Sequence, residues 1–424
     1  MLLYSKGSET DVISSADLKA GLIEALDKLG PRNNVLILPP DITRFHSRAG
    51  ELTQYVYEYY GEAVKAILPA IGTHFPMTEP EIEEMFGDIP RELFIGHDWR
   101  NDVVTLGEVP GEFVAEVSEG AVDYSWPAQV NKIIRDGGFD LVLSVGQVVP
   151  HEVVGMANHS KNIFVGTGGA EAINKSHFLG AAYGMERMMG RALTPVRQVL
   201  DYACEHFLTD IPVLYVQTVV GRADDGDLVT RGMYIGEDLE CFELAAKLSL
   251  AVNFEMLDEP VSNVLVYLDP SEFKSTWLGN KAIYRTRMAI ADGGKLTILG
   301  PGVKEFGEDG EIDRLIRKYG YVGTKEVLRL VQENDDLRNN LSAAAHLIHG
   351  STEDRFTVIY CTGGLTKEEV EAANFEYADV DEMTAKYQPA NLKDGLNTLP
   401  DGEEVFYISN PAIGLWSSKE RFGG

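Results

Sequence analysis

Short apolar runs that end in polar loops and lead into helical patterns are the feature that most constrains this chain. Residues 35–41 (VLILPPD) predict a buried strand that ends in prolines and an aspartate. Further strands of this kind are predicted at residues 66–71, 93–95 and 140–149. Helical patterns lie between them, at residues 51–66, after the N-cap candidate Thr78 and at residues 127–135. Such alternation is typical of a parallel α/β sheet.

The same alternation continues through the second half of the chain. A strand at 211–219 and a long helix at 239–252 precede an apolar strand at 261–268, where we place the domain change. We therefore expect an α/β protein with two α/β domains, mainly parallel sheets and an active-site cleft between them. The expected boundaries are residues 1–260, residues 261–403, and a tail, residues 404–424, whose strand could return to the first domain.

Composition excludes several classes of partner. The 424-residue chain carries a net charge of −29, which disfavours nucleic acid and anionic membranes as partners. It has no apolar run of about 18 residues that would span a bilayer and no signal-peptide pattern. Its three cysteines are scattered and form no metal-spaced pair, so we expect a reducing, cytoplasmic location.

Polar side chains gather where the predicted strands end. Asp41, His74, the pair at 97–98 and His151 each follow a strand. Ligands bind at the carboxyl ends of strands in open α/β sheets, so we expect these groups at one edge. Two imidazoles that face one cavity can act as acid and base on opposite sides of a substrate, which suits an inversion of configuration.

Arg44 lies three residues after Asp41 in the same loop. Its planar guanidinium is well suited to a carboxylate substrate. A local salt bridge between Asp41 and Arg44 explains the spacing equally well.

The segment from Val145 to His177 contains further candidate reactive and binding residues. Within it, Lys161 could act as a point charge or as a nucleophile, and His177 could reach the same site across a short helix. The glycines of GTGGA at 166–170 precede a helix and could hold a phosphate, or could form a plain strand-to-helix turn. The common nucleotide-binding and hydrolase motifs are missing from the sequence.

Four ordered elements together resemble the nickel-dependent lactate racemase family. They are DITR at 41–44, GTHFPMTEPE at 72–81, PHEVVGMANHSK at 150–161, and His177, sixteen residues after Lys161. The resemblance extends over nearly the whole chain and is strongest from about residue 35 to 180.

The resemblance implies a cofactor and a role for each site residue. The family uses a nickel-pincer nucleotide, a pyridinium-3-thioamide-5-thiocarboxylate mononucleotide that carries nickel. By resemblance, Lys161 holds it through a thioamide, His177 ligates nickel and Asp41 supports the cofactor site. His74 and His151 are the acid/base pair. Arg44 and, from the second domain, Lys281 bind the substrate, a small 2-hydroxy acid. Cofactor-maturation enzymes are implied as partners.

The sequence departs from the family at three places. Asn158-His159-Ser160 stands where the family has glycines before the lysine, which leaves covalent attachment at Lys161 open. Leu278, beside Trp277, replaces a glutamine of the lactate enzymes, and their later tryptophan has no counterpart near Arg338. We therefore expect a racemase or epimerase of a 2-hydroxy acid other than lactate, such as an aldonate.

Two other functions use the same residues. A zinc-dependent hydrolase or lyase would employ the histidines as metal ligands. A non-catalytic nucleotide-binding protein would keep the fold without turnover.

Overall fold

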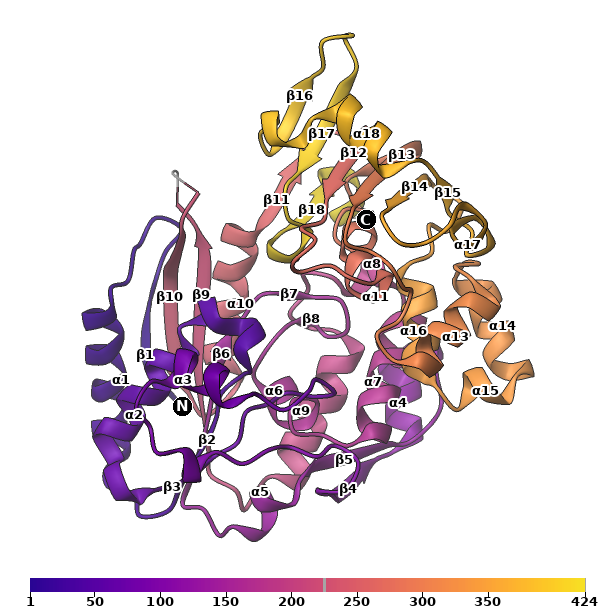
Figure 1. The fold of residues 1–424 in the computed structure, drawn as a ribbon. Coiled ribbons are helices and arrows are strands. Elements are labelled where there is room, and N and C mark those ends of the chain that lie inside the picture. Colours follow the sequence, from indigo (N-terminus) through magenta and orange to yellow (C-terminus); the bar gives the residue numbers. More distant parts are fainter. Residues whose placement is uncertain (224–225, 424) are drawn as a thin grey trace. The chain divides into compact units, whose positions relative to one another are not determined.

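The computed structural model describes residues 1–223 and 226–423 and contains two compact units (Figure 1). Unit 1 comprises Met1–Leu179 and Met188–Asn253, and unit 2 comprises Gly180–Arg187 with the chain from Phe254 onward. Each unit contains helices and a six-stranded sheet that is mainly parallel, which confirms the expected fold class. Among the described residues, no helix combines the length and the apolar composition needed to cross a bilayer.

The sheet of unit 1 has the strand order β1-β10-β9-β6-β2-β3. The strands β9, β6, β2 and β3 run parallel, whereas β10 and β1 add to the sheet in antiparallel fashion. The bounds of these strands are β1 Leu2–Gly7, β2 Val35–Leu38, β3 Val64–Ile67, β6 Leu141–Gln147, β9 Val213–Arg222 and β10 Leu228–Gly236. β2 and β6 are buried along their whole length, as strands covered on both faces must be.

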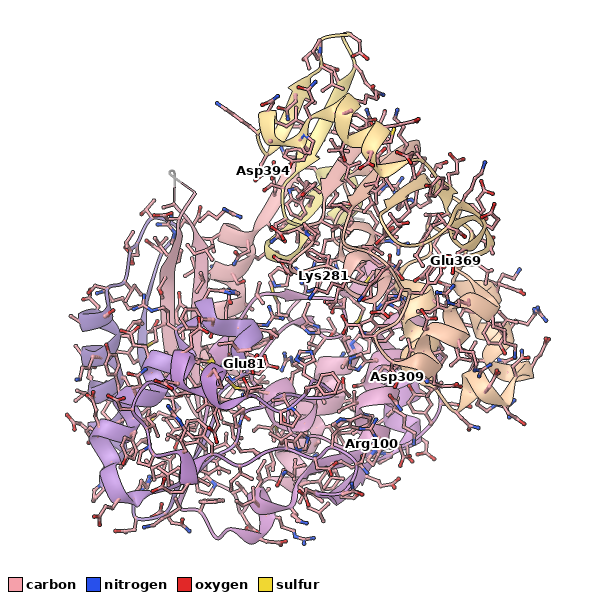
Figure 2. All side chains as sticks on the ribbon, viewed as in Figure 1. Glu81, Arg100, Lys281, Asp309, Glu369 and Asp394 are labelled. Atoms are coloured by element: carbon pink, nitrogen blue, oxygen red, sulfur yellow. The ribbon has the colours of Figure 1, made fainter. Side chains whose placement is uncertain are left out.

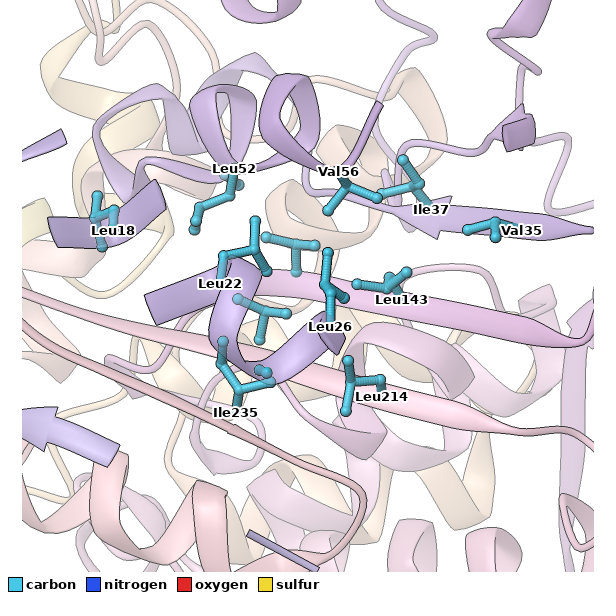
Figure 3. Close-up of a cluster of buried hydrophobic side chains, with 14 of the residues drawn as sticks. Leu18, Leu22, Leu26, Val35, Ile37, Leu52, Val56, Leu143, Leu214 and Ile235 are labelled. Atoms are coloured by element: carbon cyan, nitrogen blue, oxygen red, sulfur yellow. The ribbon is translucent and has the colours of Figure 1, made fainter. Parts of the chain in front are cut away.

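Two helices, α1 (Ser15–Leu29) and α2 (Ala49–Tyr60), pack on one face of this sheet (Figure 3). Leu18, Leu22 and Leu26 recur at helical spacing along α1 and are fully buried against sheet residues such as Leu143. Ser14 caps the helix by accepting a hydrogen bond from the Asp17 amide at 3.2 Å. Periodicity and capping thus fix α1 on the sheet.

Further elements of unit 1 follow the strands or surround their ends. Thr78 caps α3 in a capping box with Glu81, as the sequence predicts. The helices are η1 Ile42–Ser47, η2 Gly61–Ala63, α3 Glu79–Phe86, η3 Arg91–Leu93, α4 Gly111–Val117, α5 Lys132–Asp136, α6 Ser160–Phe164, α7 Ala170–Tyr183, α9 Pro195–Phe207 and α10 Leu239–Asn253. The end of α7 from Gly180 and nearly all of α8 (Met185–Met188) belong to unit 2. The short strands are β4 Val103–Val109, β5 Trp126–Asn131, β7 Pro150–His151 and β8 Gly155–Met156.

Two local predictions in unit 1 are wrong. Most of the predicted helix at 127–135 is strand β5, which pairs antiparallel with β4. Pairing with a distant segment here overrides the local helical pattern. The predicted strand at 93–95 is a 3₁₀ turn followed by one parallel bridge between Ile67 and Phe94.

Unit 2 contains the second sheet, in the order β15-β14-β13-β12-β17-β16. The strands of unit 2, which include the separate pair β11 and β18, are β11 Phe254–Leu257, β12 Val261–Tyr267, β13 Ile290–Gly300, β14 Thr357–Thr362, β15 Glu376–Tyr377, β16 Gly395–Thr398, β17 Glu404–Ile408 and β18 Leu415–Ser418. Its helices are α11 Thr276–Gly279, α12 Lys281–Tyr284, α13 Gly310–Tyr319, α14 Thr324–Glu333, α15 Asp335–Arg338, α16 Leu341–His349, α17 Lys367–Ala372, α18 Val380–Tyr387, η4 Pro389–Asn391, η5 Pro411–Ile413 and α19 Lys419–Phe422.

The C-terminal segment belongs to unit 2, which corrects the expectation that residues 404–424 return to the first domain. β17 pairs parallel with β12 inside the second sheet, and β18 pairs parallel with β11. Unit 2 therefore starts at Phe254, before the expected boundary at 261. It also includes residues 180–187, because Glu186 accepts hydrogen bonds from Arg287 at 3.2 Å and Arg355 at 2.6 Å.

Close packing of α2 on α3 leaves no room for a side chain at Gly50. A Cβ atom at this position would lie 2.1 Å from the backbone oxygen of Met85. Gly50→Ala should therefore lower the free energy of unfolding by about 1–3 kcal/mol, as overpacking does. Chemical denaturation followed by circular dichroism measures the change. Gly96→Ala is the matched control, because a Cβ atom added there would meet open space, and equal losses for both variants would contradict this packing.

Candidate active site

The polar loops that follow β2, β3 and β6 meet at one edge of the sheet in unit 1. These three strands are parallel neighbours, so their carboxyl ends point to the same side. Backbone hydrogen bonds tie the loops together: Ala70 N–H donates to Pro39 O at 2.7 Å, and Gly72 N–H donates to Gly166 O at 2.8 Å. The loop that carries His74 is thus fixed to the segments that carry Asp41 and Lys161.

Asp41 and His74 form a carboxylate–imidazole pair. Asp41 caps η1, accepts hydrogen bonds from the amide and hydroxyl of Thr43, and accepts one from Nδ1 of His74 at 2.6 Å. Burial alone would raise the pKa of Asp41, but the bonds from His74 and Thr43 lower it overall. The Asp41 side chain is 6% exposed and that of His74 is 60% exposed, so the pair presents its imidazole to ligands.

His151 is buried at the start of a tight hairpin formed by β7 and β8. The backbone N–H of Val153 donates to Nδ1 of its ring at 3.1 Å. Oε2 of Glu152 lies 3.8 Å from the same nitrogen. The hairpin of β7 and β8 therefore fixes the orientation of the His151 ring.

Lys161 lies in α6, which is anchored to two strand ends. The side-chain amide of Asn162 donates to Leu38 O and to Ser144 Oγ, each at 3.0 Å. Burial and, to a smaller extent, the positive charge of Arg44 together lower the pKa of Lys161 to about 8, against the opposing carboxylates of Glu152 and Asp41. An amine of this kind is far more nucleophilic at neutral pH than an exposed lysine.

His177 lies in α7 with the properties of a metal ligand. Its Nδ1 donates to Ile173 O at 2.7 Å, so Nε2 carries the lone pair, the arrangement that a carbonyl acceptor imposes on metal-bound histidines. Burial lowers its pKa to about 4, with a smaller contribution from the charge of Lys161. Neutral imidazole is the form that binds metal. The described residues contain no group of three or more histidine, cysteine or carboxylate side chains arranged to hold a metal.

Asn158, His159 and Ser160, which precede Lys161, are held by a buried network. Asn158 and His159 adopt left-handed backbone angles, φ 69° and 56°, which cost energy outside glycine. His159 stacks on Tyr215 with ring centroids 3.7 Å apart. Arg197 is 1% exposed and donates to Ser160 Oγ at 2.6 Å and to Asn158 O at 3.1 Å. Ser160 Oγ in turn donates to Asp201 at 2.7 Å, so the network fixes the approach to Lys161.

The glycine-rich segment at 166–170 is a packing element. The N–H of Ala170 already donates to Trp99 O at 3.2 Å, and the N–H of Ala172 donates to the Gln129 side chain at 3.2 Å. A Cβ on Gly168 would lie 2.0 Å from Phe164 O. The plain-turn interpretation of these glycines therefore holds.

His97 is also structural. Its Nε2 donates to Gly168 O at 3.0 Å, and its Nδ1 accepts from Asn131 at 3.0 Å. The neighbouring Asp98 accepts hydrogen bonds from the backbone of its own loop. The pair at 97–98 thus supports the loop and supplies no reactive group.

Lys281 and Arg338 lie in unit 2. Lys281, labelled in Figure 2, is the first residue of α12, and its ammonium lies 5.9 Å from the ring centroid of Phe273. Arg338 donates to Val331 O at 3.2 Å and to Asp335 at 2.9 Å, which makes it a local brace. The substrate role of Lys281 stays a prediction.

Sequence reasoning missed Glu152 and Arg197. Glu152 directly follows His151, and its charge acts on both Lys161 and His177. Its position directly after His151, a candidate catalytic residue, was a signal that sequence reasoning could have used. Arg197 offered none, because nothing in a helical sequence distinguishes a buried arginine from an exposed one.

The part of the chain that contains these candidate site residues matches a known protein family. Residues 12–189 match the family model of the lactate racemase N-terminal domain. This region belongs to the lactate racemase N-terminal domain family. The resemblance expected from the motifs is thereby confirmed. Asp41, His74, His151, Lys161 and His177 all lie within the matched domain.

Two solved structures share the fold of this chain. A protein from Thermotoga maritima is 24% identical, with a TM-score of 0.79 and coverage of 97% of this chain and 100% of that one. The lactate racemase apoprotein from Thermoanaerobacterium thermosaccharolyticum is 18% identical, with a TM-score of 0.65 and coverage of 98% and 94%. No curated protein gave a match.

The buried network around Arg197 predicts a large loss of stability when it is broken. Arg197→Met removes the donor to two backbone carbonyls and leaves Asp201 without its neighbouring cation. We expect the free energy of unfolding to fall by about 3–5 kcal/mol, as for other broken buried charge networks. Urea denaturation tests this. Arg135→Met, which removes an exposed arginine paired with Asp136, should leave the midpoint unchanged.

The environment of Lys161 predicts the pH dependence of its amine. Acylation of Lys161, followed by peptide mass mapping, should reach half of its maximal rate near pH 8, because the reactive amine forms as pH rises through its pKa. Arg44→Gln removes a like charge, so it should raise the pKa and move the midpoint upward. A wild-type midpoint near the value of about 10.4 that is typical of exposed lysines would refute the site as described.

Proposed function

We propose that the protein is a racemase or epimerase of a 2-hydroxy acid that uses a nickel-pincer nucleotide. Membership of residues 12–189 in the lactate racemase N-terminal domain family supports a racemase-type function. The single observation that most supports the nickel-pincer cofactor is that Lys161 and His177 share one electrostatic environment. Each is desolvated, and each is influenced by the charge of Glu152.

The residues present fit this cofactor. Lys161 would hold it through its nucleophilic amine, and Nε2 of His177 would ligate nickel, because Nδ1 is occupied by Ile173 O. When bound, the group supplies a hydride acceptor for the C2 hydrogen of the substrate. The requirement for ligands beyond His177 agrees with a cofactor that brings its own donor atoms.

The protein's own residues would handle the substrate carboxylate and the hydroxyl proton. Arg44 would bind the carboxylate through its planar fork. His74 and His151 would form the acid/base pair, with Asp41 fixing the orientation of His74 through the 2.6 Å bond. Lys281 would also bind the substrate, as the resemblance implies. Maturation enzymes that supply the nucleotide would be the protein's partners.

The substrate proposal is a 2-hydroxy acid larger than lactate. The support comes from the sequence: Leu278, beside Trp277, stands where the resemblance implies that the lactate enzymes have a glutamine. A polyhydroxylated acid such as an aldonate fits the presence of Glu152 beside His151, since carboxylates accept hydrogen bonds from hydroxyl groups.

The two alternatives are less well supported. A zinc-dependent hydrolase or lyase needs three protein ligands, and no such group occurs in the part of the chain that the structure describes. A non-catalytic nucleotide-binding protein gives no reason for the Asp41–His74 pair, which is built to orient an imidazole.

Co-production with the cofactor-maturation enzymes tests the proposal. The intact protein should gain the mass of the nucleotide and about one nickel per chain, measured by mass spectrometry and elemental analysis. Lys161→Ala should abolish the covalent increment. Lys175→Ala is the matched control, because this lysine pairs with Glu171 on α7 and should leave loading intact.

Substrate specificity is tested on the loaded protein by polarimetry with a panel of 2-hydroxy acids. We expect interconversion of a larger acid to exceed that of lactate. A loaded protein that interconverts lactate fastest would overturn the substrate assignment, and zinc without nickel or nucleotide would overturn the reaction.

A further inference from the structure

The loop that carries His74 also holds an aromatic side chain in water. Phe75, the next residue, is 92% exposed, the highest value among the exposed large apolar side chains of the described residues. At this exposure even its Cβ atom is in solvent, so its Cα–Cβ bond points away from the protein. Single apolar residues are common on protein surfaces. Phe75 differs from them because an apolar cavity lies directly beside it.

This cavity belongs to unit 1 and has a volume of about 170 Å³. Its walls include residues on both sides of Phe75 in the chain, Ile71 before it and Pro76 and Met77 after it. The other lining residues are Pro69, Ile82, Phe94, Ile95, Gly96 and His97. An apolar cavity of about 150 Å³ can hold a benzene molecule, so this one has room for the ring of Phe75.

Backbone constraints link the position of the Phe75 ring to that of His74. Rotation about the Cα–Cβ bond leaves the ring in solvent, because that bond points outward. Pro76 restricts Phe75 to extended backbone angles, so the chain must turn between Gly72 and His74 to bring the ring inward. Gly72 has a φ of 59° and can leave that angle at little cost. Neighbouring side chains of an extended segment point to opposite sides, so a turn that brings Phe75 inward moves His74 away from Asp41.

We propose that the loop from Gly72 to Met77 exchanges between two states. In the first, which the structure has, the 2.6 Å bond to Asp41 holds His74 and leaves Phe75 in water. In the second, Phe75 fills the apolar cavity and His74 is released from Asp41. A hydrogen bond to a charged group and the burial of one aromatic ring contribute free energies of similar size, so neither state excludes the other.

The exchange regulates the candidate site. The second state takes away an imidazole of the proposed acid/base pair, so it is inactive, and a ligand that contacts His74 favours the first state. This consequence rests on the proposed function, whereas the two states of the loop do not depend on it.

Fluorine NMR of the full chain without cofactor tests the two states. 4-Fluorophenylalanine replaces Phe75 alone, and the change in its resonance between light and heavy water reports how far the ring is exposed to solvent. With His74 present, we expect mainly the solvent-dependent resonance of an exposed ring. His74→Ala removes the bond and leaves Asp41 in place as the cap of η1. The label should then move to a new resonance that has lost at least half of its solvent dependence.

Filling the cavity tests where the ring goes. A Cβ atom added to Gly96, which lines the cavity, would meet no atom within 4 Å, so Gly96→Leu puts a side chain into that space. Combined with His74→Ala, it should return the label at position 75 to water. Ile82→Trp fills the same cavity from α3 and serves as a second filler if the first variant does not fold.

The same label at Phe45, which is 52% exposed in η1, is the matched control and should keep its solvent dependence in His74→Ala. A label at position 75 that stays exposed in His74→Ala overturns the proposal, and so does a buried label that the cavity-filling variants leave unchanged. Failure of the proposed function is a separate result: a loaded protein that interconverts no 2-hydroxy acid leaves these resonances as they are.

Discussion

The hydrogen bonds from Asn162 to Leu38 O and Ser144 Oγ are the interaction on which the site depends. They fasten the short helix α6 to the ends of two parallel strands, β2 and β6. A five-residue helix has little stability of its own, so tertiary contacts must hold it. Because Lys161 precedes Asn162, the same anchor places its amine at the edge where the loops after β2 and β3 deliver Asp41 and His74.

Burial and local charge then give these groups their chemistry. The chain as a whole carries a net charge of −29, which repels anions at long range. The site opposes this with Arg44, whose charge lowers the pKa of Lys161, and with Arg197, fully buried beneath the same segment. Desolvation keeps His177 neutral. An anionic substrate and a metal-bearing group can thus be accommodated at one edge of an acidic protein.

The sequence allowed the architecture to be predicted, because it depends on local patterns, whereas the roles of the candidate site residues stay predictions. Apolar runs ending in polar loops located β2 and β6, and Thr78 with Glu81 located the start of α3. What could not be predicted depends on distant pairing. Strand β5 looked helical until β4 paired with it, and the last strands joined unit 2 through β11 and β12. Hydrogen-bond partners likewise decided that His97 is structural and that Asp41 orients His74, and spacing alone carries no such information.

The most direct test of the central assignment is anomalous diffraction at the nickel edge from crystals of the protein produced with its cofactor. The assignment predicts a nickel peak within bonding distance of Nε2 of His177, with continuous density from the cofactor to the amine of Lys161. A nickel peak bound elsewhere, or a nucleotide that contacts neither residue, would contradict it.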